Sequence, residues 1–257
     1  QGASVDDTVE IIVFDVFSVA DTVSAGSGGS FGGNIGIGGT LSVTGNVVSP
    51  ITLGGTTPTL TIGDAGAEDT KIVFDGNAQD YHIGLDDSAD TLVIGKGSAL
   101  GTTTAMSFDA NGIITKPLQP AFLANVGTQQ NNIATGSNVT VLLNTEIFDQ
   151  NADYNTSNYT FTAPVTGRYF LAFNLSIAAI DAGASFHQFK IATSNRTHAA
   201  TYSEAGSTDP SYSIFNYSVI TDMDAADTAT VQFFQNDGAA QADIRATEST
   251  FSGYLVA

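Results

Sequence analysis

The stretch Tyr159-Thr-Phe-Thr-Ala-Pro-Val-Thr-Gly-Arg-Tyr-Phe-Leu-Ala-Phe173 decides the fold of this chain. Apolar residues lie on both sides of a Pro-Val-Thr-Gly turn, which predicts a strand, a turn and a second strand. The second strand is rich in aromatic residues, which pack well on a half-buried pleated surface. The stretch therefore predicts a β-protein. No part of the sequence predicts a helix longer than one turn.

A wider pattern surrounds this stretch. The order and spacing of Leu143, Asp149, Tyr154, Phe161 and the Gly-Arg-Tyr-Phe-Leu-Ala-Phe segment resemble the signature of the globular-head family of complement C1q and the tumour necrosis factors. Leu143 and Leu171 stand where that family usually has Phe. The ending Ser249-Thr-Phe-Ser-Gly-Tyr-Leu-Val-Ala257 is similar to the family's Phe-Ser-Gly ending. The resemblance covers residues 117–257 and implies a jelly-roll head that works as a homotrimer.

The rest of the chain divides into three parts by composition. Residues 1–24 contain an Ile-, Val- and Phe-rich run at 9–19, which predicts an attachment strand that pairs with a virion protein or a neighbouring subunit. Residues 25–56 are rich in glycine and predict a linker and a β-stem. In residues 57–116 short strand segments recur between Gly, Asp and Asn residues, which predicts a β-meander domain.

Two of these parts are similar to bacteriophage fibres. Ile35, Ile37, Leu41 and Val43 alternate with small residues and resemble fibre stem repeats in which three chains intertwine. A disordered linker is the alternative for that segment. The sequence of residues 71–95 resembles a motif that recurs in tail and head fibres of marine phages. Together the resemblances imply an intertwined homotrimer with an all-β stem and head.

The charge of the chain excludes several classes of partner. There are 26 acidic and 7 basic residues, a formal net charge of −19, and no basic cluster. This balance argues against nucleic acid and anionic membrane surfaces as partners. No segment is apolar and long enough to span a membrane, because the longest apolar run contains Asp15. The absence of cysteine means that no disulfide holds the protein together.

The residues that could support catalysis are few. His82, His187 and His198 have no acidic or histidine neighbour in the sequence at a spacing typical of a metal site or a catalytic triad. The sequence also lacks a nucleophile elbow, a phosphate-binding loop and a dinucleotide fingerprint. We therefore expect no catalytic residues and no enzyme activity.

One acidic loop is a candidate metal site. Asp222, Asp224 and Asp227 offer three carboxylates in a single turn, and oxygen-rich loops suit calcium. Relatives of the globular-head fold can hold calcium near the trimer axis, so the resemblance implies the same use here. Exposed acidic turns without a metal are the alternative. No cofactor other than calcium is expected.

The candidate binding residues lie in the segment 202–213. Tyr202, Glu204, Asp209 and Tyr212 could supply stacking and hydrogen bonds to a glycan or protein of a host surface. The sequence thus predicts a homotrimeric virion fibre or spike, attached by its N-terminus, that recognises a host through its head. The alternatives are a capsid-decorating or filament-forming subunit that uses strand addition, and an adhesin on a bacterial cell surface.

Overall fold

The computed structural model describes residues 38, 40–43, 45, 47 and 50–257. In these residues all regular structure is β-strand, so they include no helix long and apolar enough to cross a membrane. The predicted attachment strand in residues 1–24, with its apolar run at 9–19, lies outside the described residues. Most of the predicted stem also lies outside them.

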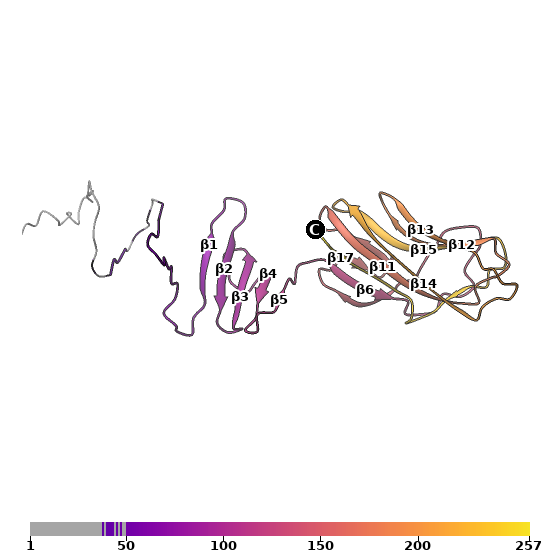
Figure 1. Cartoon of the computed structure of the whole chain (residues 1–257), viewed down its shortest axis with the longest axis horizontal. Helices are drawn as coiled ribbons and strands as arrows, with labels where there is room; N and C mark the ends of the chain where they lie inside the picture. The colour runs from indigo at the N-terminus through magenta and orange to yellow at the C-terminus, as the bar shows by residue number, and fades with distance from the viewer. Residues whose placement is uncertain (1–37, 39, 44, 46, 48–49) are drawn as a thin grey trace, which may run out of the picture. The chain divides into compact units, whose positions relative to one another are not determined.

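Residues 70–115 form a five-stranded antiparallel sheet in which the strands pair in chain order (Figure 1). This is the arrangement of a β-meander, as the sequence predicted. The strands are β1 (Thr70–Phe74), β2 (Tyr81–Asp86), β3 (Thr91–Lys96), β4 (Thr104–Phe108) and β5 (Ile114–Thr115). The last turn is closed by the Asp109 carboxylate, which accepts hydrogen bonds from the backbone N–H groups of Asn111 (2.9 Å) and Ile113 (2.7 Å). The domain limits 57 and 116 stay a prediction.

The first strand expected in this part of the chain does not form. The sequence predicted a strand at Thr59-Leu-Thr-Ile-Gly63, but these residues belong to no strand and Leu60 is exposed. In the stem segment Leu41 and Val43 are likewise exposed and outside any strand. A strand needs a neighbour that pairs with its backbone groups. β1 pairs only with β2, so nothing in the described chain pairs with the segment before it.

The head consists of two antiparallel sheets. The first contains, in spatial order, β13 (Thr197–Tyr202), β12 (Phe186–Thr193), β15 (Thr228–Asn236), β10 (Thr160–Thr162) and β9 (Tyr154–Asn155), with β7 (Val139–Thr140) also paired to β15. The second contains β14 (Tyr212–Met223), β11 (Gly167–Ala178), β17 (Thr250–Leu255), β6 (Ala121–Asn125) and β8 (Thr145–Asp149), with β16 (Asp243–Ile244) also paired to β11. Figure 1 shows the long strands of both sheets side by side.

The sequence stretch that decides the fold becomes the centre of the second sheet. β11 pairs with β14 over its whole length, from Gly167 opposite Met223 to Ala178 opposite Tyr212. On its other side it pairs with β17 and with β16. A strand paired on both sides cannot shift its register without turning its buried side chains outward. The head is therefore a sandwich of two antiparallel sheets, the arrangement of the jelly roll that the resemblance implied.

The core lies between the two sheets and contains the aromatic residues of the signature. Phe161, Tyr169, Phe173 and Phe251 are all buried and belong to the hydrophobic core. The ring of Phe122 lies 4.7 Å from that of Phe161 and 5.0 Å from that of Tyr154, centroid to centroid. Leu143 and Leu171, the two departures from the family pattern, are also fully buried.

Candidate functional site

Tyr202 packs at the edge of the hydrophobic core of the head and does not belong to an exposed loop. It is the last residue of β13, and its ring lies edge-on to Phe215 at 5.0 Å and 6.3 Å from the His187 ring. Its hydroxyl donates a hydrogen bond to the Glu204 carboxylate. The aromatic surface predicted to contact a partner is therefore largely occupied by the protein itself.

Glu204 shapes the loop that follows. Its carboxylate accepts the Tyr202 hydroxyl and also the backbone N–H of Gly206 at 3.2 Å. These bonds hold the pKa of the Glu204 carboxyl below its usual range, the tyrosine making the larger contribution. The same bond raises the pKa of Tyr202, since the phenol is held as a donor. Tyr202 and Glu204 thus form a local pair within the predicted binding segment.

Asp209 fastens the loop to two other loops of the head. Its carboxylate accepts hydrogen bonds from the backbone N–H of Ala182 at 2.8 Å and from Nε2 of Gln241 at 2.6 Å. Both bonds lower the pKa of the Asp209 carboxyl, the backbone bond most strongly. Asp209 therefore holds the 203–211 segment in place, and each of its two carboxylate oxygens accepts one of these hydrogen bonds.

Tyr212 is the candidate that presents its side chain outward. It begins β14 and is 63% exposed. The guanidinium of Arg245 lies 4.4 Å from the centroid of its ring, which is a cation–π distance. Arg245 in turn pairs with Glu248 at 2.9 Å. Of the four predicted binding residues, Tyr212 combines an exposed aromatic ring with a positive neighbour in an otherwise acidic protein.

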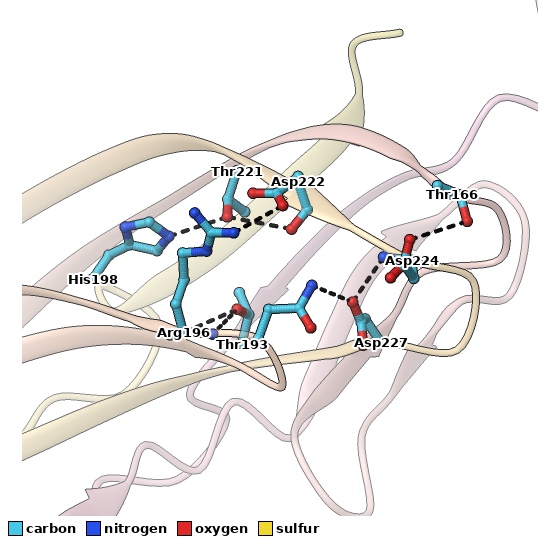
Figure 2. A network of polar contacts seen from close by, with 9 residues as sticks. Thr166, Thr193, Arg196, His198, Thr221, Asp222, Asp224 and Asp227 are labelled. Atoms are coloured by element: carbon cyan, nitrogen blue, oxygen red, sulfur yellow. Dashed lines mark hydrogen bonds and ion pairs between the residues drawn. The ribbon is translucent and has the colours of Figure 1, made fainter.

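The acidic loop predicted to hold calcium lies between β14 and β15, and Figure 2 shows its polar contacts. Asp222 forms an ion pair with Arg196 at 2.8 Å. Asp227 accepts hydrogen bonds from Ser194 at 2.8 Å, from Asn195 at 2.6 Å and from the backbone N–H of Asp224 at 2.7 Å. Asp222 and Asp227 therefore bind different residues of the 193–197 turn, and the Asp224 carboxylate accepts a hydrogen bond from the Thr166 hydroxyl at 3.5 Å.

These contacts use both carboxylate oxygens of Asp227 and one oxygen each of Asp222 and Asp224. The hydrogen bonds, led by that from the Asp224 backbone, hold the pKa of the Asp227 carboxyl below its usual range. Among the residues that the structure describes, no group of three His, Asp or Glu side chains is placed to hold a metal ion. The structure thus does not bring Asp222, Asp224 and Asp227 together as ligands. Calcium binding at this loop stays a prediction.

An exposed apolar row crosses the outer face of the second sheet. Phe170 of β11 lies opposite Ile220 of β14 and opposite Tyr254 of β17, and the three side chains form this row. Ile220 is 59% exposed and Tyr254 48% exposed, and the rings of Phe170 and Tyr254 are 5.2 Å apart. Ile220 and Tyr254 come beside Phe170 only through the pairing of β14 and β17 with β11.

A cleft of about 620 Å³ lies on the same sheet beside the apolar row. Its lining comes from three strands and contains Phe170, Ala172, Phe173, Asn174, Asn216, Tyr217, Ser218, Thr250 and Ser252. Apart from the phenol of Tyr217 none of these side chains is ionisable, so the cleft offers hydrogen bonds without a carboxylate or a cationic group. Its lining contains no acid, base or nucleophile pair of the kind that catalysis requires.

His187 is a buried titratable group on β12. It lies between the rings of Phe233 (5.8 Å, stacked) and Tyr202, and no part of it is exposed. Burial lowers the pKa of its imidazole below the ordinary value of 6.5 and outweighs the opposing effect of the Asp181 and Glu204 carboxylates. The folded protein therefore favours the neutral ring.

We expect the free energy of unfolding to fall between pH 7.5 and pH 5 because of His187. Its contribution is fully present above pH 6.5, and it is lost as the pH falls toward the lowered folded pKa, since the unfolded chain then binds a proton that the folded chain does not. Urea unfolding at pH 5, 6 and 7.5 measures this. His187→Gln should flatten the profile relative to wild type, and an unchanged pH slope would contradict the assignment.

Comparison with known proteins gives one family. The C1q domain family matches residues 121–256, which is more than half of the chain. Among solved structures, the globular domain of zebrafish complement 1qA is similar at 17% identity, covering 54% of this chain and 98% of that one with a TM-score of 0.39. Murine APRIL at pH 8.0 is similar at 9% identity, covering 54% and 99% with a TM-score of 0.41. No curated protein matches the chain.

Proposed function

The chain belongs to the C1q domain family. We propose that it is a homotrimeric virion fibre or spike whose head recognises a host surface. The activity is binding without chemical turnover. Three identical heads on one fibre would multiply weak contacts through avidity. The alternative location is a bacterial cell surface, where the same architecture would serve as an adhesin.

The apolar row carries the proposal of a trimer. The apolar row, formed by Ile220, Phe170 and Tyr254, lies on the outside of a sheet whose inner face already packs against the core. Exposed strips of this kind, rimmed by polar residues such as those of the cleft, are typical of protein–protein interfaces. An obligate interface buries about 2,000 Å² or more, so the strip would be the centre of a larger contact.

Two features of the chain support a virion fibre. Residues 71–95 resemble a recurring phrase of marine phage fibres, and the apolar run at 9–19 suits strand addition to a virion protein or a neighbouring subunit. The net charge of −19 disfavours nucleic acid as the target. The same charge would repel an anionic cell envelope, so contact would need a locally neutral patch or bridging divalent cations.

The head loops at the Tyr212 end support host recognition. Tyr212 offers a ring for stacking on a sugar or a side chain, and Arg245 places a positive charge against it. Asp209 and the Tyr202–Glu204 pair hold the neighbouring loop in one conformation. A rigid support under an exposed aromatic residue favours binding because little conformational entropy is lost on contact. The target would be a glycan or a protein of the host surface.

One experiment tests both parts of the proposal. The purified full chain should have the mass of a trimer in light scattering and should compete with particles for adsorption to host cells. Ile220→Asp should reduce the trimer and weaken competition by at least about tenfold through lost avidity. Thr201→Asp, which adds the same charge at an exposed position of the other sheet, should behave as wild type. Tyr212→Ala should remain trimeric but compete less well.

The outcomes separate the alternatives. A monomeric wild-type chain would overturn the trimer. A trimer that does not compete, with Tyr212→Ala particles adsorbing normally, would favour a capsid-decorating or filament-forming subunit. Removing residues 1–24 should release the protein from the particle while leaving competition by the soluble trimer intact.

A further inference from the structure

The five-stranded sheet β1–β5 has one face that is almost entirely apolar. The strand register places one set of alternating residues on it, and we call this set the apolar meander face. Its apolar members are Ile72, Phe74, Tyr81, Ile83, Leu85, Leu92, Ile94, Met106, Phe108 and Ile114. Seven of them are exposed: Ile72, Phe74, Tyr81, Ile83, Leu85, Leu92 and Ile114. Contiguous exposed apolar surface of this kind marks an interface.

The opposite face of the same sheet is covered at its centre. His82 and Val93 are buried there, and Nδ1 of His82 lies 2.8 Å from the carbonyl oxygen of Gly97. A Cβ atom added at Gly84 would lie 2.8 Å from a methyl group of Leu100, and one at Gly95 would lie 2.5 Å from the His82 ring. The 97–103 loop therefore covers this face over β2 and β3 with the chain's own atoms, whereas Val73 at the edge strand β1 remains 37% exposed. The larger uncovered apolar surface lies on the other face.

Nothing in the described part of the chain supplies that layer. Ile62 lies beside a shallow groove of about 190 Å³ that Ile72, Ile83, Leu85 and Leu92 help to line, and it remains 43% exposed. A single sheet with an open apolar face is not expected to be stable alone, because domains bury such a face against another element. A second layer, from another part of the chain or from another molecule, must therefore cover it.

The charge of the face suits a second copy of the same chain. The protein has 26 acidic residues, yet none of the strand residues on the apolar meander face is acidic. Lys96, opposite Tyr81, is the charged strand residue on this face. Two copies of a protein with a net charge of −19 repel each other over most of their surfaces. On this face they could meet without contact between carboxylates.

The short connection to the head would bring the meander sheets of different copies close together. Residues 116–120 join β5 to β6, and five extended residues span at most roughly 20 Å. If three heads assemble as proposed above, three meander sheets are held within a short distance of one another. Such tethering gives an effective concentration in the millimolar range, far above that of an unlinked partner.

We infer that the apolar meander faces of three copies pack against one another, so that three single-layer sheets enclose one shared core. The inference rests on the proposed trimer of heads. The meander would then have an interface of its own between copies, separate from any interface formed by the C1q domain.

Single cysteines test the inference, because the chain has no native cysteine. Ile83 and Val73 are each 37% exposed in one chain but lie on opposite faces of the sheet. In the full-length trimer, Ile83→Cys should react with a maleimide at least about tenfold more slowly than Val73→Cys, because only the former is buried between copies. Mild oxidation should give covalent dimers with Ile83→Cys and with Leu92→Cys, but not with Val73→Cys.

The other possible results of these labelling and cross-linking experiments distinguish between the remaining explanations. Equal reaction rates in a protein of trimer mass would overturn the inference and leave the trimer of heads standing. A monomeric wild-type chain would overturn both. Protection of Ile83→Cys that disappears when residues 1–24 are removed would show that this segment covers the face instead. Protection and cross-linking that persist in Ile220→Asp would show that the meander assembles without the head interface.

Discussion

Replacing Phe161 by alanine should lower the free energy of unfolding of the head by about 3–5 kcal/mol. The side chain is fully buried in a strand of three residues, β10, between β9 and β15. Its ring stacks on Phe122 at 4.7 Å and lies 5.4 Å from the ring of Tyr169. Truncation removes both contacts and leaves a cavity between two sheets that are held apart by the surrounding residues.

Urea unfolding of the full chain at fixed protein concentration measures this effect. Phe234→Ala is the matched control, since Phe234 is a half-buried phenylalanine on β15 that contacts Phe186 at 5.8 Å and lies under Lys190. Losing such an aromatic contact on the outer face should cost only about 1 kcal/mol. Equal unfolding midpoints for the two variants would show that Phe161 is not a core residue.

The head fold could be predicted from the sequence because its signature positions are core positions. Leu143 and Leu171 replace the usual phenylalanines and are still fully buried. A core requires apolar side chains of suitable volume more than it requires a particular ring. The spacing of apolar residues, which sets which of them face inward, is therefore preserved where the residue type is not.

The candidate site was less predictable, because its contacts join distant parts of the chain. The sequence indicates that aromatic residues near the 203–211 loop are exposed, but β13 extends to Tyr202 and brings its ring against Phe215. The charge pattern around Asp222 suggests a free carboxylate, whereas Arg196 already pairs with it. No local pattern reveals which partner a charged side chain will find after folding.

The apolar row shows the same limit. Phe170 is recognisable in the sequence as part of an apolar strand. Ile220 and Tyr254 become its neighbours only because β14 and β17 pair with β11 in a particular register. The meander face differs, since its strands pair in chain order and alternation alone places its apolar residues together. Local pairing is thus predictable from sequence where non-local pairing is not.

Substitution of Gly253 is the second change expected to have a large effect. Gly253 lies in β17 between Leu171 of β11 and Phe122 of β6, and it is buried. A Cβ atom at this position would lie 2.6 Å from a methyl group of Leu171, 2.8 Å from the Phe122 ring and 2.9 Å from the backbone oxygen of Phe170. The first two groups could move slightly, but the third belongs to the sheet backbone.

Gly253→Ala should therefore destabilise the head by about 1–3 kcal/mol, and Gly253→Val by more than about 3 kcal/mol. Gly206→Ala is the control, because its Cβ would lie 3.4 Å from the nearest atom, an oxygen of Glu204. That change should leave the urea midpoint unaltered or raise it slightly. If Gly253→Ala and Gly206→Ala unfold at the same urea concentration, the close packing at Gly253 is not essential.

The same geometry explains the Phe-Ser-Gly ending of the chain in physical terms. Phe251 and Gly253 face the core on alternate positions of β17, while Tyr254 faces outward into the apolar row. The large ring of Phe251 fills the space beside Phe122 at 5.0 Å. At Gly253, where Phe122 and Leu171 meet across the strand, no volume remains for a side chain. A large side chain at position 251 and no side chain at position 253 are therefore both required by the packing, and the Gly253→Val variant tests the second requirement directly.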